Sequence, residues 1–89
     1  MDEEELYSLI SFIEMSKHRT KIIDFLQEQD EPRTPTDIAR STEIHRNHVS
    51  NQLNRMKEKD LVKVLNPDSP RNRYYRLTGK GEQILSEIG

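Results

Sequence analysis

The chain has 89 residues, contains no cysteine and carries a formal net charge of −2. This length suits a single domain, residues 1–89, that buries about 60% of its unfolded surface, and the lack of cysteine excludes disulfides and thiolate metal sites. No apolar run is long enough to span a membrane, and the acidic start Met-Asp-Glu-Glu-Glu is not a secretory signal, so we expect a cytoplasmic protein.

The first predicted helix covers residues 1–15. Asp2 is a suitable N-cap, and the glutamates that follow favour the positive end of the helix dipole. Four apolar residues then recur at i, i+3, i+4 and i+7, namely Leu6, Leu9, Ile10 and Ile13. Such a stripe must be covered, either by the chain's own domain or by a second copy of the chain.

Two further helices are predicted before residue 42. Ser16 can cap a helix that runs to about Gln29 and is ended by Pro32. The run Thr34-Pro35-Thr36-Asp37 has the chemistry of a second helix start, with Thr34 as the N-cap, and this short helix ends at about Ser41. The turn that follows contains no glycine. His45 stands at the position of a capping Ser or Thr, so the next helix starts at His45 or is capped by Asn47.

Residues 46–59 form the predicted helix that carries the function. Val49, Leu53 and Met56 make one narrow apolar stripe. The opposite face and its flanks are polar, and they hold Arg46, Asn47, Ser50, Asn51, Asn54, Arg55 and Glu58. Asparagine is unusual on a solvated helix surface because it favours turns, whereas amides and guanidinium groups read base edges and phosphates. We interpret this face as a nucleic-acid-binding surface rather than an ordinary solvated one.

A β-hairpin is predicted after this helix. Residues 61–65 and 73–77 show the alternation of strands, and the segment between them is dense in turn formers. In the first strand, Val62 and Val64 are expected to share one face, and Leu61 and Leu65 the other. The hairpin therefore ends in an exposed loop, residues 66–73.

The hairpin loop has a basic tip. Arg71 and Arg73 lie there, where cations contact the phosphates of DNA or enter its minor groove. Two further cations, Lys63 and Arg76, lie within the strands, and their candidate ion-pair partners are Asp60 and Asp68.

A final helix follows Thr78, which is its predicted N-cap. Gly81 in its first turn is expected to permit close packing against a neighbouring segment. The apolar positions of this helix are Ile84, Leu85 and Ile88.

Charge is distributed unevenly along the chain. Residues 1–32 hold three Lys or Arg and nine Asp or Glu, whereas residues 33–76 hold ten and five. The basic segment coincides with the Asn-rich helix and the hairpin. This is the pattern expected when one surface meets phosphates and the rest of the molecule keeps the protein soluble.

The motifs together resemble a known family. The run Asp37-Ile38-Ala39 is followed by Ile44, Val49-Ser50, Leu53, Met56, Leu61-Val62, then Tyr74-Tyr75-Arg76-Leu77-Thr78 and Gly81. This pattern, over residues 16–85, resembles the winged helix-turn-helix transcriptional regulators of the multiple-antibiotic-resistance (MarR) and arsenical-resistance (ArsR) types, and is most similar to small archaeal regulators.

The resemblance implies a mostly α fold with a small β-hairpin. It implies a three-helix core, a hairpin wing, extra N-terminal and C-terminal helices, and a second motif helix that lies in the major groove. It further implies a homodimer whose interface is built by the N-terminal helix, residues 1–15, or alternatively by the C-terminal helix.

We therefore predict a sequence-specific transcriptional regulator that binds double-stranded DNA. Helix 46–59 would read the major groove, and wing 66–73 would contact the backbone or the minor groove. The predicted DNA-binding residues are Arg46, Asn47, Ser50, Asn51, Asn54, Arg55, Arg71 and Arg73.

The alternative is a winged-helix module for protein assembly that never touches DNA, which the low net charge and the acidic ends favour. No catalytic arrangement is present, so an enzyme and a cofactor are not expected. His18, His45 and His48 lack the further ligands that a zinc site needs, so no metal is expected. Nothing in the sequence identifies a small-molecule effector.

Overall fold

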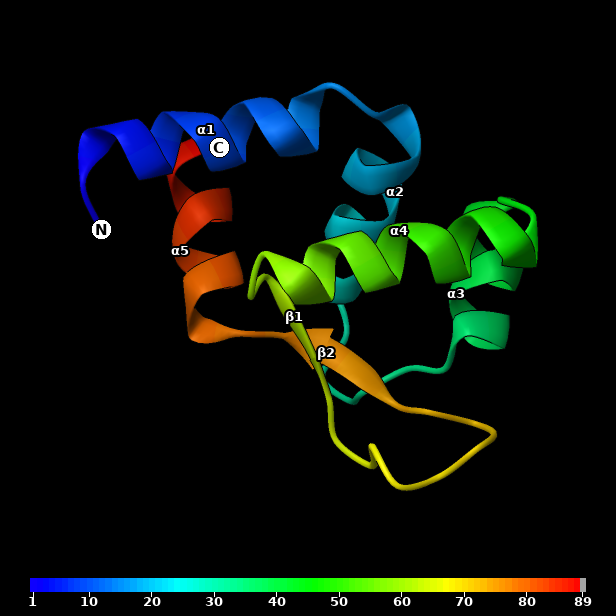
Figure 1. Ribbon diagram of the computed structural model, residues 1–89. Coiled ribbons are helices and arrows are strands. Elements are labelled where there is room, and N and C mark those ends of the chain that lie inside the picture. Colours follow the sequence, from blue (N-terminus) through cyan, green and yellow to red (C-terminus); the bar gives the residue numbers. More distant parts are fainter. Residues whose placement is uncertain (89) are drawn as a thin grey trace.

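The computed structural model describes residues 1–88 and has the predicted architecture, five helices and a two-stranded antiparallel hairpin (Figure 1). The elements in chain order are α1 (Glu3–Glu14), α2 (Lys17–Gln27), α3 (Pro35–Thr42), α4 (Arg46–Glu58), β1 (Val62–Val64), β2 (Tyr75–Leu77) and α5 (Gly79–Ile88). The prediction of a winged helix-turn-helix fold is confirmed.

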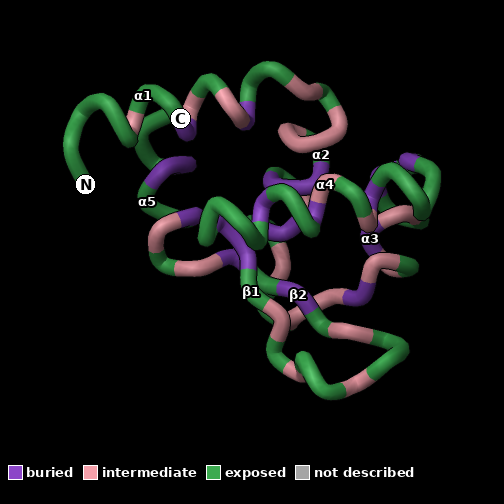
Figure 2. Tube along the Cα trace, viewed as in Figure 1, coloured by how far each residue is buried: buried purple, intermediate pink, exposed green. Residues whose placement is uncertain are grey.

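The core lies where α2, α3 and α4 pack together and extends to α1, the strands and α5, and Figure 2 shows buried segments on the strands and α5 as well as on the three helices. The apolar stripe predicted for α4 is fully buried, since Val49, Leu53 and Met56 are each 0% exposed. Ile22 and Ile23 from α2 and Ile38 from α3 are equally inaccessible. Each such side chain contributes about 1.5–3 kcal/mol on burial, which fixes the position of α4 against the other two helices.

The helix starts follow the capping chemistry read from the sequence. Asp2, Ser16 and Thr34 each accept a hydrogen bond from the backbone N–H three residues on, at 2.7, 3.2 and 3.2 Å. In α3 the Asp37 carboxylate also accepts from the Thr34 N–H, at 3.4 Å, which completes a capping box. The start of α4 is set by His45, whose Nδ1 accepts from the Asn47 N–H at 3.2 Å.

The turn between α3 and α4 is made without glycine. Glu43 adopts the left-handed conformation, with φ 59° and ψ 28°, at the C-cap of α3. Glycine usually occupies such a position because a Cβ atom makes this conformation costly by roughly 1–2 kcal/mol. Burial of Thr42 and Ile44 on either side of Glu43 holds the turn in place.

The end of α2 lies two residues before the predicted Gln29. The N–H groups of Glu28 and Gln29 bond to Phe25 and Leu26, three residues back, at 3.2 Å each. This tightened last turn closes the helix before Pro32.

The wing pairs Val62 with Leu77 and Val64 with Tyr75. Arg33, just before α3, extends the sheet at the other edge of β2, because its N–H and C=O bond to Tyr75 at 3.0 and 2.8 Å. Leu61 and Leu65 do not share a face, contrary to the prediction, since Leu61 is 0% and Leu65 is 45% exposed. Leu61 precedes β1 and follows the left-handed Asp60 (φ 61°), so the strand alternation starts only at residue 62.

The N-terminal helix packs on its own domain. Leu9 and Ile13 are 5% and 2% exposed within the single chain, where α1 contacts α2 and α5. The Lys80 ammonium lies 2.6 Å from the Glu5 carboxylate and joins α5 to α1. The inner half of the apolar stripe is therefore core, and only its outer edge is left for a second copy.

Candidate nucleic-acid interface

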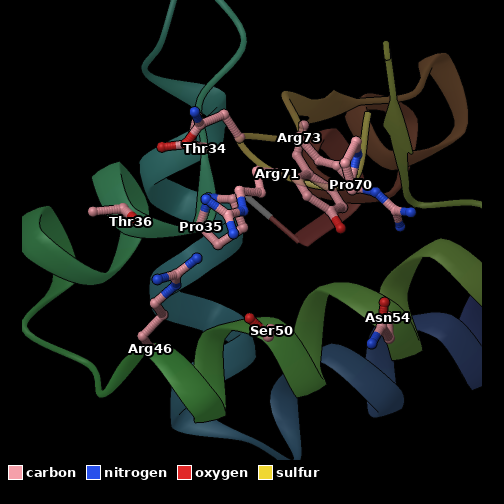
Figure 3. Close-up of a pocket in the computed structure, with 11 residues that line it drawn as sticks. Thr34, Pro35, Thr36, Arg46, Ser50, Asn54, Pro70, Arg71 and Arg73 are labelled. Atoms are coloured by element: carbon pink, nitrogen blue, oxygen red, sulfur yellow. The ribbon is translucent and has the colours of Figure 1, made fainter. Parts of the chain in front are cut away.

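A concave surface of about 240 Å³ opens between the start of α3, the outer side of α4 and the wing (Figure 3). Five of the eight predicted DNA-binding residues meet here, from two elements that are distant in sequence. Its lining residues are Thr34, Pro35, Thr36, Arg46, Ser50, Asn54, Pro70, Arg71, Asn72, Arg73 and Tyr75. Three guanidinium groups thus share one polar hollow, an arrangement suited to anionic oxygen atoms.

The wing loop is held by its own side chains. Asn66 bridges its two sides, since its Nδ2 donates to the Asn72 carbonyl at 3.1 Å and its Oδ1 accepts from the Tyr74 N–H at 2.7 Å. Arg73 Nε donates to the Ser69 carbonyl at 3.0 Å. Asn72 has φ 53°, a conformation that asparagine tolerates well.

The two wing arginines therefore differ in role. Part of the Arg73 guanidinium is used to hold the loop. The Arg71 side chain is exposed and forms no hydrogen bond or ion pair with any residue in 1–88. Arg71 is the wing residue whose charge is free to meet a ligand.

The outer face of α4 is solvent-exposed. Asn47 and Asn51 lie on it outside the concavity, and both side chains are exposed, as are those of Arg46 and Asn54. Arg55 is also exposed, but it lies on the flank of α4 that faces α2. The predicted site residues thus fall into a group at the wing, a pair on the open face and one residue on the opposite flank.

Arg19 of α2 is a feature of this opposite flank that sequence reasoning missed. Its Nε donates to the Gln52 Oε1 at 2.9 Å, its Nη1 donates to the Phe12 carbonyl, and its Cζ lies 4.0 Å from the centre of the Phe12 ring. Partial burial, and then the positive charge of Arg55, lower the pKa of Arg19. No sequence signal marks Arg19, because its partners come from two other helices.

The three histidines gather at one end of α4. The ring centres of His18 and His48 are 5.1 Å apart, and those of His45 and His48 are 6.1 Å apart. Residues 1–88 contain no group of three or more histidine, aspartate or glutamate side chains placed to hold a metal ion.

Lys63 and Arg76 face each other across the hairpin, and both are exposed. The expectation that they pair with Asp60 or Asp68 is wrong, because Lys80–Glu5 is the sole ion pair among residues 1–88. Asp60 adopts the left-handed conformation, and its carbonyl accepts from the Thr78 hydroxyl at 2.6 Å.

None of the helices in the described part of the chain combines the length and apolarity needed to cross a membrane.

Known structures share this arrangement of helices and wing. The Staphylococcus aureus MepR–DNA complex matches with a TM-score of 0.73 and 18% identity, over 97% of this chain and 71% of that one. Rv1404 of Mycobacterium tuberculosis matches with a TM-score of 0.74 and 15% identity, over 96% of this chain and 59% of that one. The chain thus spans only part of these proteins. No curated protein matches the sequence closely enough to count as a relative.

A third structure has a size closer to that of this chain. It is the homodimeric winged helix-turn-helix DNA-binding domain of Mb0332 from Mycobacterium bovis, described as a possible ArsR-family regulator. It matches with a TM-score of 0.71 and 21% identity, over 93% of this chain and 76% of that fragment. At these identities the matches establish the fold.

The family is established by sequence. The model of a helix-turn-helix domain family matches residues 15–64, which span α2, α3, α4 and the first strand of the wing. The helix-turn-helix is a DNA-binding motif, and the family is one of transcription regulators and not of enzymes. The chain therefore belongs to the helix-turn-helix domain family and has the winged fold of the MarR-like and ArsR-like transcriptional regulators.

Proposed function

We propose that this protein is a sequence-specific regulator that inserts α4 into the major groove of double-stranded DNA and lays wing 66–73 on the backbone or in the adjacent minor groove. The observation that carries the proposal is the concavity in which Arg46 of α4 meets Arg71 and Arg73 of the wing. A helix with side chains is about 10–12 Å wide and fills a major groove about 12 Å wide. With α4 in the groove, the wing extends over the neighbouring backbone.

The chemistry of the open face of α4 favours DNA over a protein partner. Asn47 and Asn51 offer amides, which pair bidentately with adenine. A protein interface usually has aromatic and methionine anchors in a desolvated centre, and α4 contains no Phe, Tyr or Trp. Met56, the methionine of α4, is 0% exposed and belongs to the core. Two structures with the same fold, MepR and CouR, were determined in complex with DNA, which supports the same role for this chain.

Substitutions in α4 and in the wing are expected to have different effects on specificity. Asn51→Ala removes a proposed base contact and should cost about 1–3 kcal/mol on a selected target site, but much less on random DNA. Arg71→Ala should weaken binding to both DNAs about equally, because a phosphate contact carries no sequence information. Target sites selected from random duplexes and fluorescence anisotropy at fixed salt provide the measurement.

Equal losses for Asn51→Ala on both DNAs would remove it from base readout. If no sequence is enriched although duplex DNA is bound, the protein binds without sequence specificity. If no duplex is bound at low salt, the assembly alternative replaces the proposal.

We propose further that the protein is a homodimer that pairs through the outer surfaces of α1 and α5. In Figure 1 both helices lie away from the wing loop, residues 66–73, so the DNA-binding surface stays free. Tyr7 on α1 is 62% exposed and Ile88 on α5 is 37% exposed. Beside Ile88 lies a shallow groove of about 200 Å³, lined by Ile13, Glu14, Thr20, Asp24, Leu85 and Ile88.

The double variant Tyr7→Glu with Ile88→Glu is expected to sediment as a monomer, because two carboxylates cannot be desolvated in an apolar interface without partners. Point substitutions are preferable to truncation, since Leu9 and Ile13 of α1 are part of the core. The control is Leu65→Glu on the wing, where the side chain is 45% exposed. A dimer that persists in the double variant would contradict the interface, and a monomeric wild-type protein would contradict the dimer.

A DNA-binding regulator must share a compartment with DNA. We therefore propose that the protein acts in the cytoplasm.

A further inference from the structure

Three cations lie together where α1, α2 and α4 meet, on the flank of α4 away from the wing. They are Arg19 of α2 and, at the end of α4, Arg55 and Lys59, and we refer to them as the junction cations. The Arg19 guanidinium carbon and the Lys59 ammonium lie 4.0 and 5.6 Å from the centre of the same ring, that of Phe12. The Arg55 charge is close enough to lower the pKa of Arg19, after the larger effect of burial.

The junction cations form no ion pair with any described residue, although Glu5, Glu58 and Asp60 line the same shallow hollow as Lys59. The sole ion pair within residues 1–88 joins Lys80 to Glu5, so none of the junction cations has an acidic partner within 4 Å. Arg55 and Lys59, the C-cap residue of α4, are also like charges four residues apart, and such charges repel each other. The Phe12 ring relieves part of this repulsion through its π face. An anion bound from outside would relieve the rest.

Arg19 is held in a fixed position. The Phe12 carbonyl and the Gln52 side chain occupy two of its five N–H donors, one on Nη1 and one on Nε. A guanidinium that is already immobilised loses less entropy when it binds an oxyanion than a free side chain does.

The cluster is placed where a DNA strand would pass. Arg46, in the concavity, and Arg55 are nine residues apart, so at about 100° per residue they lie on opposite sides of α4. The two walls of the major groove are the phosphate backbones of the two strands, and a helix about 10–12 Å wide approaches both. When the wing side of α4 meets one strand, the opposite side meets the other.

We infer that the junction cations form a second phosphate-binding site. It binds a backbone phosphate of the DNA strand opposite to the one that the wing contacts. Arg55 and Lys59 supply the exposed charge, and Arg19 is a positioning residue that ties α1 and α2 to the middle of α4 through Phe12 and Gln52. The inference rests on the proposed insertion of α4 into the major groove. It adds Lys59 to the residues that contact DNA and Arg19 to those that position them, and neither role is predicted from the sequence.

The test compares the salt dependence of DNA affinity among charge-matched variants of the full chain. Arg55→Gln and Lys59→Gln, singly and together, remove charge at exposed positions. Each lost phosphate contact should lower the slope of log K against log salt by about 0.9, and should reduce the loss of affinity between 50 and 200 mM about 3.5-fold. Lys21→Gln is the control, because Lys21 is exposed on the face of α2 opposite to Arg19 and should keep the wild-type slope.

A measurement on the free protein separates a binding role from a structural one. At Arg55 the repulsion from Lys59 and the attraction to the negative end of the α4 dipole oppose each other, so Arg55→Gln should change the thermal midpoint of the free protein by less than about 3 °C while it weakens DNA binding. A larger fall in the midpoint would overturn the inference, because Arg55 would then stabilise the fold. Arg19→Gln is not suitable for this comparison, because it would also remove the contacts to Phe12 and Gln52.

The outcomes distinguish failure of the second phosphate-binding site from failure of the proposed function. Suppose that the wild type binds DNA and that Arg71→Gln lowers the salt slope, while the Arg55/Lys59 double variant keeps the wild-type slope. The proposed function then stands, and the second phosphate-binding site is wrong. If the wild type binds no duplex at 50 mM salt, the proposed function itself fails. A third experiment titrates the protein with inorganic phosphate and follows the NMR signal of Arg19 Nε–H. If this signal shifts while substitution of Arg55 and Lys59 leaves DNA binding unchanged, the site binds free anions and its assignment to DNA is overturned.

Discussion

DNA affinity is expected to fall by about 10³–10⁵ between 50 and 200 mM salt, although the net charge of the chain is −2. Binding releases counterions from the duplex, so log K declines linearly with log salt, with a slope of about −0.9 per phosphate contact. A dimer would make roughly 6–10 such contacts, and this number of contacts gives the stated loss of affinity. The cations available in each protomer are Arg46, Arg55, Lys57, Lys59, Arg71 and Arg73.

The acidic N-terminal region should not cancel this dependence. Glu3 and Glu4 begin α1, which lies away from the wing in Figure 1. Glu5 lines a hollow together with Lys59, but its carboxylate is paired with the Lys80 ammonium at 2.6 Å. Exposed charges more than about 10 Å apart are largely screened at 0.1 M salt. Anisotropy titrations at four or more salt concentrations measure the slope, and Lys21→Gln serves as a control for the loss of a positive charge outside the interface. A curve that is flat in salt would mean that the arginines point elsewhere, and would favour the protein-assembly alternative.

Gly81→Ala is expected to destabilise the protein by about 3 kcal/mol, which is at the upper end for overpacking of a filled site. A Cβ atom at this position would lie 2.3 Å from the Leu61 carbonyl oxygen and 3.3 Å from its carbon. The clashing group is backbone, and that oxygen accepts the Thr78 N–H at 3.0 Å, so it cannot move without loss of a hydrogen bond. For a domain of this size the change corresponds to a fall in the thermal midpoint of about 12–24 °C.

Gly79→Ala is the matched control for this substitution. Gly79 lies two residues earlier in α5, and a Cβ atom there would meet nothing within 4 Å. Alanine restricts the unfolded chain more than glycine does, so Gly79→Ala should be neutral or stabilising by up to about 1 kcal/mol. Similar midpoints for the two variants would show that α5 moves away from Leu61 easily, and would contradict the close packing proposed at this junction.

The sequence alone determined the features that depend on residues close together in the chain. The N-caps Asp2, Ser16, Thr34 and Thr78 each bind a backbone N–H three residues on, so the residue types at that spacing are sufficient to predict them. The buried stripe of α4 follows from helical periodicity in the same way. These local signals predicted the number and order of the helices, the hairpin and five residues of the concavity.

Only the tertiary structure decided features in which a residue's partner is remote in sequence. The stripe of α1 could have been core or interface, and burial of Leu9 and Ile13 against α2 and α5 made its inner half core. Packing also placed Glu43 in a left-handed turn, because burial of Thr42 and Ile44 outweighs its backbone cost.

The division of α4 into a flank beside the wing and a flank beside α2 is likewise a property of the packed structure. A helical wheel shows which residues share a side of α4, but it does not show what lies beside each side. The wing covers the Arg46 side, and α2 brings Arg19 to the other, through a hydrogen bond to Gln52 that joins residues 33 positions apart. Periodicity carries no information about such a contact, since it depends on how two helices cross and on which long side chains the crossing brings together.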